Sequence, residues 1–267
     1  KQLYYYSLIN SQRFQEAYIF SKKLEKNNLD NFESNLIAGV YYLKNNNHKK
    51  ASFYINQLKG DGPTMNLQVL LTQSLSNWIS LKETTEINGL KLINSIPASF
   101  ENMKKIQNAL ATCYFNSFQT ETVFKQLTSG KKNNFSRYNF FYANYLNNQG
   151  KIQASKIVIE ESIKRSPKNL IMRQFKEDLT KNKKDFSNQF DCQNLSHNIA
   201  EIFYILSNAL AGQSAFKLSN FYLNLAKYLN PNFTSFETML AQNFNSFGQL
   251  DKSKKIYREI LKKGKVY

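Results

Sequence analysis

A period of 34 residues constrains the fold of this chain more than any other feature of its sequence. Small residues recur at this distance in three pairs, which are Ala17 and Ala51, Ser214 and Gly248, and Ser219 and Ser253. A fixed period of this length is typical of stacked helical hairpins, because a single hairpin cannot bury its apolar face alone. The sequence therefore predicts a helical repeat protein.

Four segments carry the repeat pattern in the same phase. They begin at Phe32, Ser136, Ala200 and Thr234. In the first of them, Gly39 and Ala51 are the small residues at the expected helix crossing, and Pro63 ends the unit. Small side chains let two helix backbones approach closely, and proline lacks the N–H that a continuing helix needs. These residues resemble the tetratricopeptide repeat. The resemblance implies a right-handed α-solenoid of about seven antiparallel helix hairpins.

The composition agrees with an all-α fold. The chain has 267 residues and 42% hydrophobic content, which is enough for a continuous core. Nine glycines and four prolines leave little material for a loop-rich β fold. The chain has no run of 18 apolar residues, so we expect no transmembrane segment.

The repeat pattern divides the chain into three parts. Residues 1–181 form the expected N-terminal array with divergent middle units, and residues 198–267 form a C-terminal pair of units. Residues 182–197 between them are polar and lack helical periodicity, which predicts a connector loop. We expect Phe186 and Phe190 of this connector to dock on the repeat surface or in its groove, because exposed aromatic rings are costly in a free linker.

A second resemblance is more specific than the repeat itself. The Gly62-Pro63 pair before a helix with Trp78, the run from Ile199 to Tyr204 and the run from Leu225 to Pro231 resemble an alphaproteobacterial family of tetratricopeptide-repeat proteins. That resemblance implies a bacterial scaffold in the cell envelope or periplasm, with the cytoplasm as the alternative. Because the chain begins with Lys1 inside a helical pattern, we expect it to be a fragment or a processed product.

The residue types needed for catalysis or metal binding are scarce and scattered. Cys113 and Cys192 are isolated and have no metal-ligand spacing, so we expect each to be a free, largely buried thiol. His48 and His197 have no Cys, Ser or carboxylate set nearby that forms a triad or a metal site. The sequence therefore predicts no enzyme activity, no catalytic residue, no metal and no cofactor.

The positive charge raises the alternative of an anionic partner. The chain has 36 basic and 19 acidic residues, a net charge of +17, and its densest basic cluster runs from Lys252 to Lys265. A dedicated nucleic-acid surface is usually a stripe or patch, whereas this excess is spread along the chain. We interpret the cluster as a solvated helix face. The alternative hypothesis is a helical repeat protein that binds nucleic acid or an anionic surface.

The expected concave groove would be lined by the first helix of each hairpin. Its predicted lining residues are Lys105, Asn108, Phe115, Asn116, Arg137, Phe140, Asn144, Asn147, Asn148, Tyr204, Asn208, Gln242 and Asn245. Carboxamides both donate to and accept from a peptide backbone, so this set suits an extended peptide of little sequence dependence. The opposing interpretation is that asparagine is abundant throughout the chain. The predicted function is a non-enzymatic scaffold that binds a peptide or protein partner, and the oligomeric state is left open.

Overall fold

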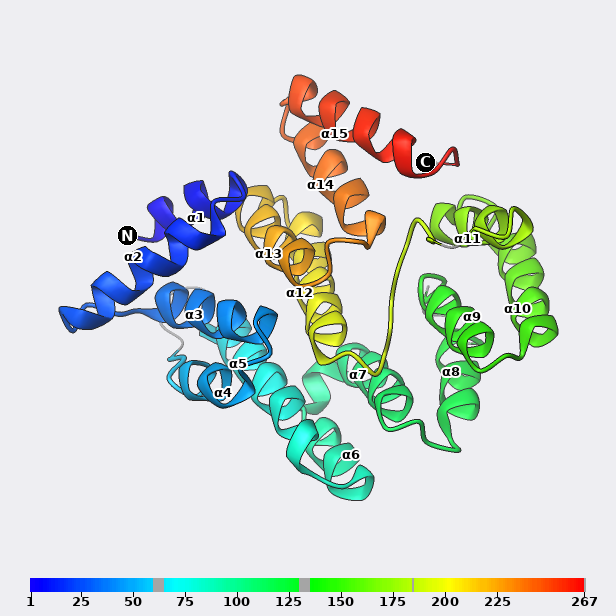
Figure 1. The fold of residues 1–267 in the computed structure, drawn as a ribbon, viewed down its shortest axis with the longest axis horizontal. Coiled ribbons are helices and arrows are strands. Elements are labelled where there is room, and N and C mark those ends of the chain that lie inside the picture. Colours follow the sequence, from blue (N-terminus) through cyan, green and yellow to red (C-terminus); the bar gives the residue numbers. More distant parts are fainter. Residues whose placement is uncertain (60–64, 130–134, 184, 267) are drawn as a thin grey trace. The chain divides into compact units, whose positions relative to one another are not determined.

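The computed structural model describes residues 1–59, 65–129, 135–183 and 185–266, and it confirms the all-α prediction. Within these ranges the chain forms fifteen α-helices and two short 3-10 helices, and successive helices pack against each other (Figure 1). The α-helices are α1 (Gln2–Asn10), α2 (Phe14–Lys26), α3 (Phe32–Lys44), α4 (His48–Ile55), α5 (Met65–Ser80), α6 (Glu86–Asn94), α7 (Glu101–Tyr114), α8 (Thr120–Ser129), α9 (Tyr138–Asn148), α10 (Ile152–Arg165), α11 (Leu170–Thr180), α12 (Leu195–Gly212), α13 (Phe216–Leu229), α14 (Thr234–Ser246) and α15 (Leu250–Lys263). The 3-10 helices are Leu81–Glu83 and Ala98–Phe100. None of the helices in the described ranges is long and apolar enough to cross a bilayer.

The helices form two compact units. Unit 1 contains residues 1–104 and 195–229, and unit 2 contains residues 105–194 and 230–267, so their boundary falls inside α7. The two hairpins expected to form a C-terminal pair therefore belong to different units, α12 and α13 to unit 1 and α14 and α15 to unit 2. The connector after α11 belongs to unit 2.

Four hairpins have the same kind of helix crossing, with a small residue on each helix and the two residues 12 positions apart in sequence. The pairs are Gly39 and Ala51, Ala143 and Ser155, Ser207 and Ser219, and Ala241 and Ser253. In the last three pairs the serine Oγ of the second helix donates to the backbone oxygen of the first, at 2.7 to 2.8 Å. A Cβ atom added to Gly39 would lie 2.7 Å from Ile55 Cδ1, so this crossing has no room for a side chain. The small residues identified in the sequence thus lie where the helices approach most closely.

The turns of these hairpins are also alike. Each places a residue with positive φ seven positions after the first small residue, at Asn46, Gly150, Ser214 and Gly248. The amide of the next residue then bonds back to the carbonyl oxygen five residues earlier, as in the 2.9 Å bond from Lys151 N to Leu146 O. Glycine and asparagine tolerate the left-handed conformation best, which explains most of these choices. Gly62 and Pro63, predicted to end a repeat, lie outside the described residues.

Unit 1 is held together by contacts between helices that are distant in sequence. Helix α13 packs against α1 and α3, and α12 packs against α5. The rings of Phe14 and Tyr228 stack with centroids 4.2 Å apart, and Asn224 Nδ2 donates to Asn10 Oδ1 at 3.2 Å. The segment after the connector thus returns to the N-terminal helices, a pairing that repeat phase alone does not encode.

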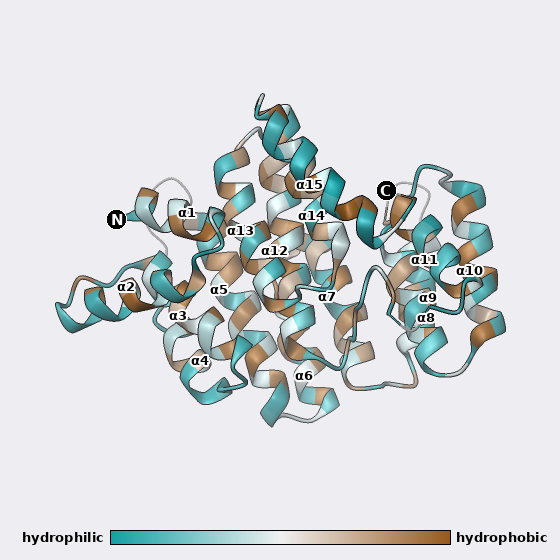
Figure 2. Ribbon diagram, turned by 45° about the horizontal axis from the view of Figure 1, so that its top comes forward, coloured by the Kyte–Doolittle hydropathy of each residue, from teal (hydrophilic) through white to brown (hydrophobic). Residues whose placement is uncertain are grey.

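Unit 2 has an aromatic core. Phe140 and Phe233 are almost fully buried, with ring centroids 5.7 Å apart, and Phe175 lies edge-on to Phe140 at 5.2 Å. Phe236 completes the group against Phe233 at 4.8 Å. By contrast, α15 is mostly hydrophilic and buries only Ser253 and Ile260, as its largely teal ribbon in Figure 2 indicates. Aromatic burial on α9, α11 and α14 therefore provides much of the stability of this unit.

Candidate functional site

An extended segment of the connector lies on the helices of unit 2. We call residues 186–190 the docked segment; they follow α11 in the stretch that Figure 1 draws without helix. Phe190 is only 6% exposed, with its ring 4.5 Å from that of Phe141, and the half-buried Phe186 packs edge-on against Phe175 at 5.4 Å. The prediction that both connector phenylalanines dock is confirmed.

Side-chain amides and a hydroxyl bind the backbone oxygens of the docked segment. Asn144 Nδ2 on α9 donates to Phe190 O at 2.7 Å, and Asn230 Nδ2 donates to Gln189 O at 2.9 Å. Thr234 Oγ1, at the start of α14, donates to Ser187 O at 2.5 Å. These bonds recognise the peptide backbone, so they would act on many sequences.

The residues just before α14 pair with the same segment. Asn188 and Phe233 form an isolated antiparallel bridge, and Gln189 N donates to Asn232 O at 2.9 Å. The side chain of Asn188 turns inward, where its Oδ1 accepts from Ser235 N at 3.0 Å near the first turn of α14. This contact needs a short side chain with an oxygen acceptor, such as Asn, Asp, Ser or Thr, and so adds one element of sequence preference.

A buried carboxylate fixes the other end of the docked segment. Asp178 on α11 has a side chain 1% exposed, and its Oδ2 accepts from Ser187 N at 2.8 Å. Its Oδ1 accepts from Gln174 Nε2 at 2.7 Å and pairs with Lys183 Nζ at 2.8 Å. A buried charge is tolerated where hydrogen bonds and a counter-charge compensate its lost hydration, as they do here.

Arg137 closes the site on the side of α14. Its guanidinium lies over the rings of Phe141 and Phe233, 5.6 and 5.3 Å from their centroids, and Nη1 donates to Ser235 Oγ at 2.5 Å. The same two rings contact Phe190. The rings of Phe141 and Phe233 therefore bind both the phenylalanine of the docked segment and, by cation–π contacts, the guanidinium of Arg137.

The predicted groove residues are distributed more widely than the docked segment. Arg137 and Asn144 lie at it, whereas Phe140 is fully buried in the aromatic core. The remaining members on α7, in the turn that follows it and on α9 are half-buried or exposed: Lys105, Asn108, Phe115, Asn116, Asn147 and Asn148. Gln242 and Asn245 are exposed on α14. Tyr204 and Asn208 belong to α12, in the other unit.

Sequence reasoning missed three residues that hold the docked segment, namely Asp178, Asn230 and Thr234. Asp178 could have been found, because it falls at helical spacing on the same face as the buried Ile171 and Phe175. An acid on an apolar face indicates a buried partner. Thr234 is marked in the sequence only as the start of the last repeat, and Asn230 lies in the turn at Pro231, where the repeat pattern indicates no binding residue.

The two cysteines form a disulfide, so the expectation of free thiols is wrong. Cys113 on α7 and Cys192, two residues after Phe190, are bonded with their Cα atoms 5.8 Å apart. They are 79 residues apart in sequence, and only the return of the connector to α7 brings them together. Spacing in the sequence carries no signal for such a pairing. The disulfide ties the docked segment covalently to unit 2.

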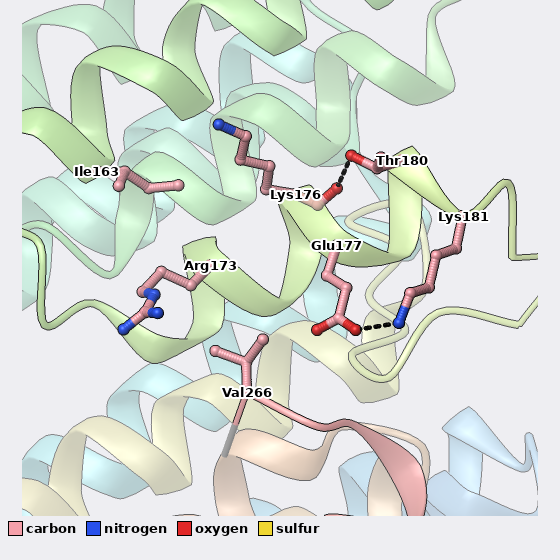
Figure 3. Close-up of a pocket in the computed structure, with 7 residues that line it drawn as sticks. All are labelled: Ile163, Arg173, Lys176, Glu177, Thr180, Lys181 and Val266. Atoms are coloured by element: carbon pink, nitrogen blue, oxygen red, sulfur yellow. Dashed lines mark hydrogen bonds and ion pairs between the residues drawn. The ribbon is translucent and has the colours of Figure 1, made fainter.

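A separate pocket of about 410 Å³ lies beside α11 (Figure 3). Its lining includes Arg173, Lys176, Glu177 and Lys181 of α11 and its end, together with Val266. Lys181 pairs with Glu177, and Lys176 pairs with Glu160 at 2.6 Å. Two of the three cationic side chains that line this pocket are therefore paired with carboxylates of the protein.

Groups that could bind a metal or titrate were sought among the described residues. They contain no group of three or more His, Cys, Asp or Glu side chains that could hold a metal ion. Burial raises the pKa of Tyr5 and, next to Glu121, that of Tyr142, each to about 12, so both phenols are neutral at physiological pH.

Comparison with known proteins gives no relative: the sequence matches no protein-family model and no curated protein.

Proposed function

We propose that this chain is a non-enzymatic interaction scaffold that binds an extended segment of a protein partner on the helices of unit 2. The observation that carries the proposal is the docked segment, whose backbone oxygens are held by Asn144, Asn230 and Thr234. The protein thus already binds a polypeptide in the way expected for a partner. The four hairpins with a common crossing and turn support a tetratricopeptide-like α-solenoid as the finer description of the fold.

The strength of such binding can be estimated from the contacts. Burial of one phenylalanine contributes about 2 to 3 kcal/mol. Six hydrogen bonds, at about 1 kcal/mol each, contribute roughly twice as much. Against these stands a cost of at least about 4 kcal/mol for immobilising the peptide, which leaves at most roughly 4 to 5 kcal/mol and a Kd on the order of 1 mM. We therefore expect a weak, reversible interaction that a longer partner or several repeats would strengthen.

The disulfide supports an oxidising location. Disulfides persist in the periplasm and outside cells, and they are rare in the cytosol. The Cys113–Cys192 bond is thus consistent with the envelope scaffold that the alphaproteobacterial resemblance implies. Alkylation of free thiols in protein taken directly from the source cells, followed by mass spectrometry, tests this part of the proposal.

A peptide supplied in trans tests the binding function. In the test variant, residues 185–191 of the chain are replaced by glycine and serine, which empties the site but keeps Cys192. A labelled peptide of residues 185–191, Asp-Phe-Ser-Asn-Gln-Phe-Asp, is then titrated into it and followed by fluorescence anisotropy. We expect saturable binding that weakens up to about tenfold when Asn144 is changed to Ala, because one hydrogen bond contributes up to about 1.5 kcal/mol.

Asn148→Ala in the same emptied variant is the matched control. Asn148 is an exposed asparagine on the same helix, and no described interaction joins it to the docked segment. Its replacement should leave the affinity unchanged. If the emptied variant keeps its helical circular dichroism yet binds no peptide at millimolar concentration, the proposed function is wrong.

A further inference from the structure

The disulfide joins the connector to α7 close to the docked segment, and it limits how far that segment can move away from its site. Cys192 follows Phe190 by two residues, and two residues of extended chain span at most about 7 Å. While the disulfide is intact, Phe190 thus cannot leave the vicinity of Cys113, which is 2% exposed in α7. Any spontaneous release of the segment is then followed by rebinding at a high effective concentration, which excludes a competing peptide.

The two cysteines differ in accessibility. Cys113 is buried, whereas Cys192 is half-buried on the connector. An external thiolate attacks the disulfide at the sulfur that it can reach, which favours the half-buried Cys192. The bond that holds the segment in place is therefore open to reduction from the connector side.

We propose that the Cys113–Cys192 disulfide is a redox switch: the oxidised form keeps the docked segment in the site as an internal ligand, and reduction opens the site to an extended partner segment. This inference rests on the proposed function. The partner segment would carry an aromatic residue at the position of Phe190 and a short side chain with an oxygen acceptor two residues earlier, where Asn188 accepts from Ser235 N. The aromatic residue fills the pocket of Phe141 and Phe233.

A dithiol reductant balances the reaction. One thiolate of the reductant attacks the sulfur of Cys192, the S–S bond breaks, and Cys113 leaves as a thiolate that takes up a proton. The second thiolate of the reductant then displaces Cys192 from the mixed disulfide. The protein gains two electrons and two protons, and the reductant becomes a disulfide.

Hydrogen exchange on the chain of 267 residues tests the switch, with dithiothreitol as the reductant. The amides of Ser187 and Gln189 donate to Asp178 and Asn232, so they are protected while the segment is docked. We expect their exchange at short labelling times to accelerate at least tenfold on reduction, a measure of local opening. The amide of Lys151, bonded to Leu146 O in the α9–α10 turn, should be unaffected.

The double variant Cys113→Ser, Cys192→Ser supplies the same test without reductant and should reproduce the faster exchange. Unchanged exchange at Ser187 and Gln189 would overturn the switch. Equal acceleration at Lys151 would also overturn it, since reduction would then loosen the folded state of unit 2 as a whole and not the docked segment in particular.

Peptide binding separates this inference from the function on which it rests. The labelled peptide of residues 185–191 should bind the reduced chain at least tenfold more tightly than the oxidised chain. If the segment opens but neither the reduced chain nor the emptied variant binds peptide, the switch holds and the proposed function fails. If the emptied variant binds peptide and reduction leaves the segment closed, the function holds and the switch fails.

Discussion

Replacement of Ala51 by leucine should destabilise unit 1 by a predictable amount. Ala51 is fully buried at the crossing of α3 and α4, and its backbone oxygen lies 3.6 Å from the position a Cβ on Gly39 would occupy. Ile55 already fills the space above Gly39, with its Cδ1 2.7 Å from that position. Three additional carbons at Ala51 must therefore displace a helix. Overpacking of this kind costs about 1 to 3 kcal/mol.

Urea unfolding followed by circular dichroism measures the effect. With a denaturant slope of about 3 kcal/mol per M, a loss of about 2 kcal/mol lowers the midpoint by about 0.7 M. Lys49→Leu is the control, because Lys49 is an exposed residue of the same helix and its change should stay within about 0.5 kcal/mol. If both variants unfold at the wild-type midpoint, the close crossing inferred from the repeat phase is incorrect.

Three further predictions concern the disulfide, pH and salt. Reduction of Cys113–Cys192 should lower the free energy of unfolding by up to about 4.5 kcal/mol, the loop entropy for a separation of 79 residues, and an unchanged urea midpoint would contradict the bond. Burial, with a contribution from Lys82, lowers the pKa of His48 in the folded state. As the pH drops below about 6.5, the unfolded chain therefore takes up a proton on His48 at a higher pH than the folded chain does, and the free energy of unfolding should fall. His48→Gln should remove that part of the pH dependence, as measured by urea midpoints between pH 5 and 7, and a variant with the wild-type dependence would exclude His48 as its source. Diffuse charge should give only weak association with RNA that fades near 0.15 M salt, and tight binding there, lost on neutralising Lys252 to Lys265, would favour the polyanion hypothesis.

The repeat pattern predicted local structure well, for a physical reason. Helix pairing within a hairpin depends on residues only 12 apart, so small residues such as Ala143 and Ser155 mark the crossing directly in the sequence. Turn residues such as Gly150 and Gly248 are equally local, because a positive φ restricts the choice of residue. These features are visible without knowledge of the rest of the fold.

Long-range pairing could not be predicted in the same way. Contacts such as Asn224 with Asn10 join segments more than two hundred residues apart, and the disulfide depends on the path of the connector. The candidate site was predicted in part for the same reason. Asn144 was found because it follows the repeat phase, whereas Asn230 acts from a turn outside that phase. The docking of Phe190 was predictable because an aromatic ring in a polar connector needs a surface to cover it.

Isotope-edited nuclear Overhauser spectroscopy of the emptied variant with the labelled peptide tests the central claim most directly. The claim is that an extended segment binds on α9 and α14 through its backbone, held by Asn144 and Asn230. The account predicts contacts from the side-chain amide protons of Asn144 to the last phenylalanine of the peptide, and from those of Asn230 to its glutamine. Contacts confined to other helices, or a peptide that binds in a helical conformation, would contradict it.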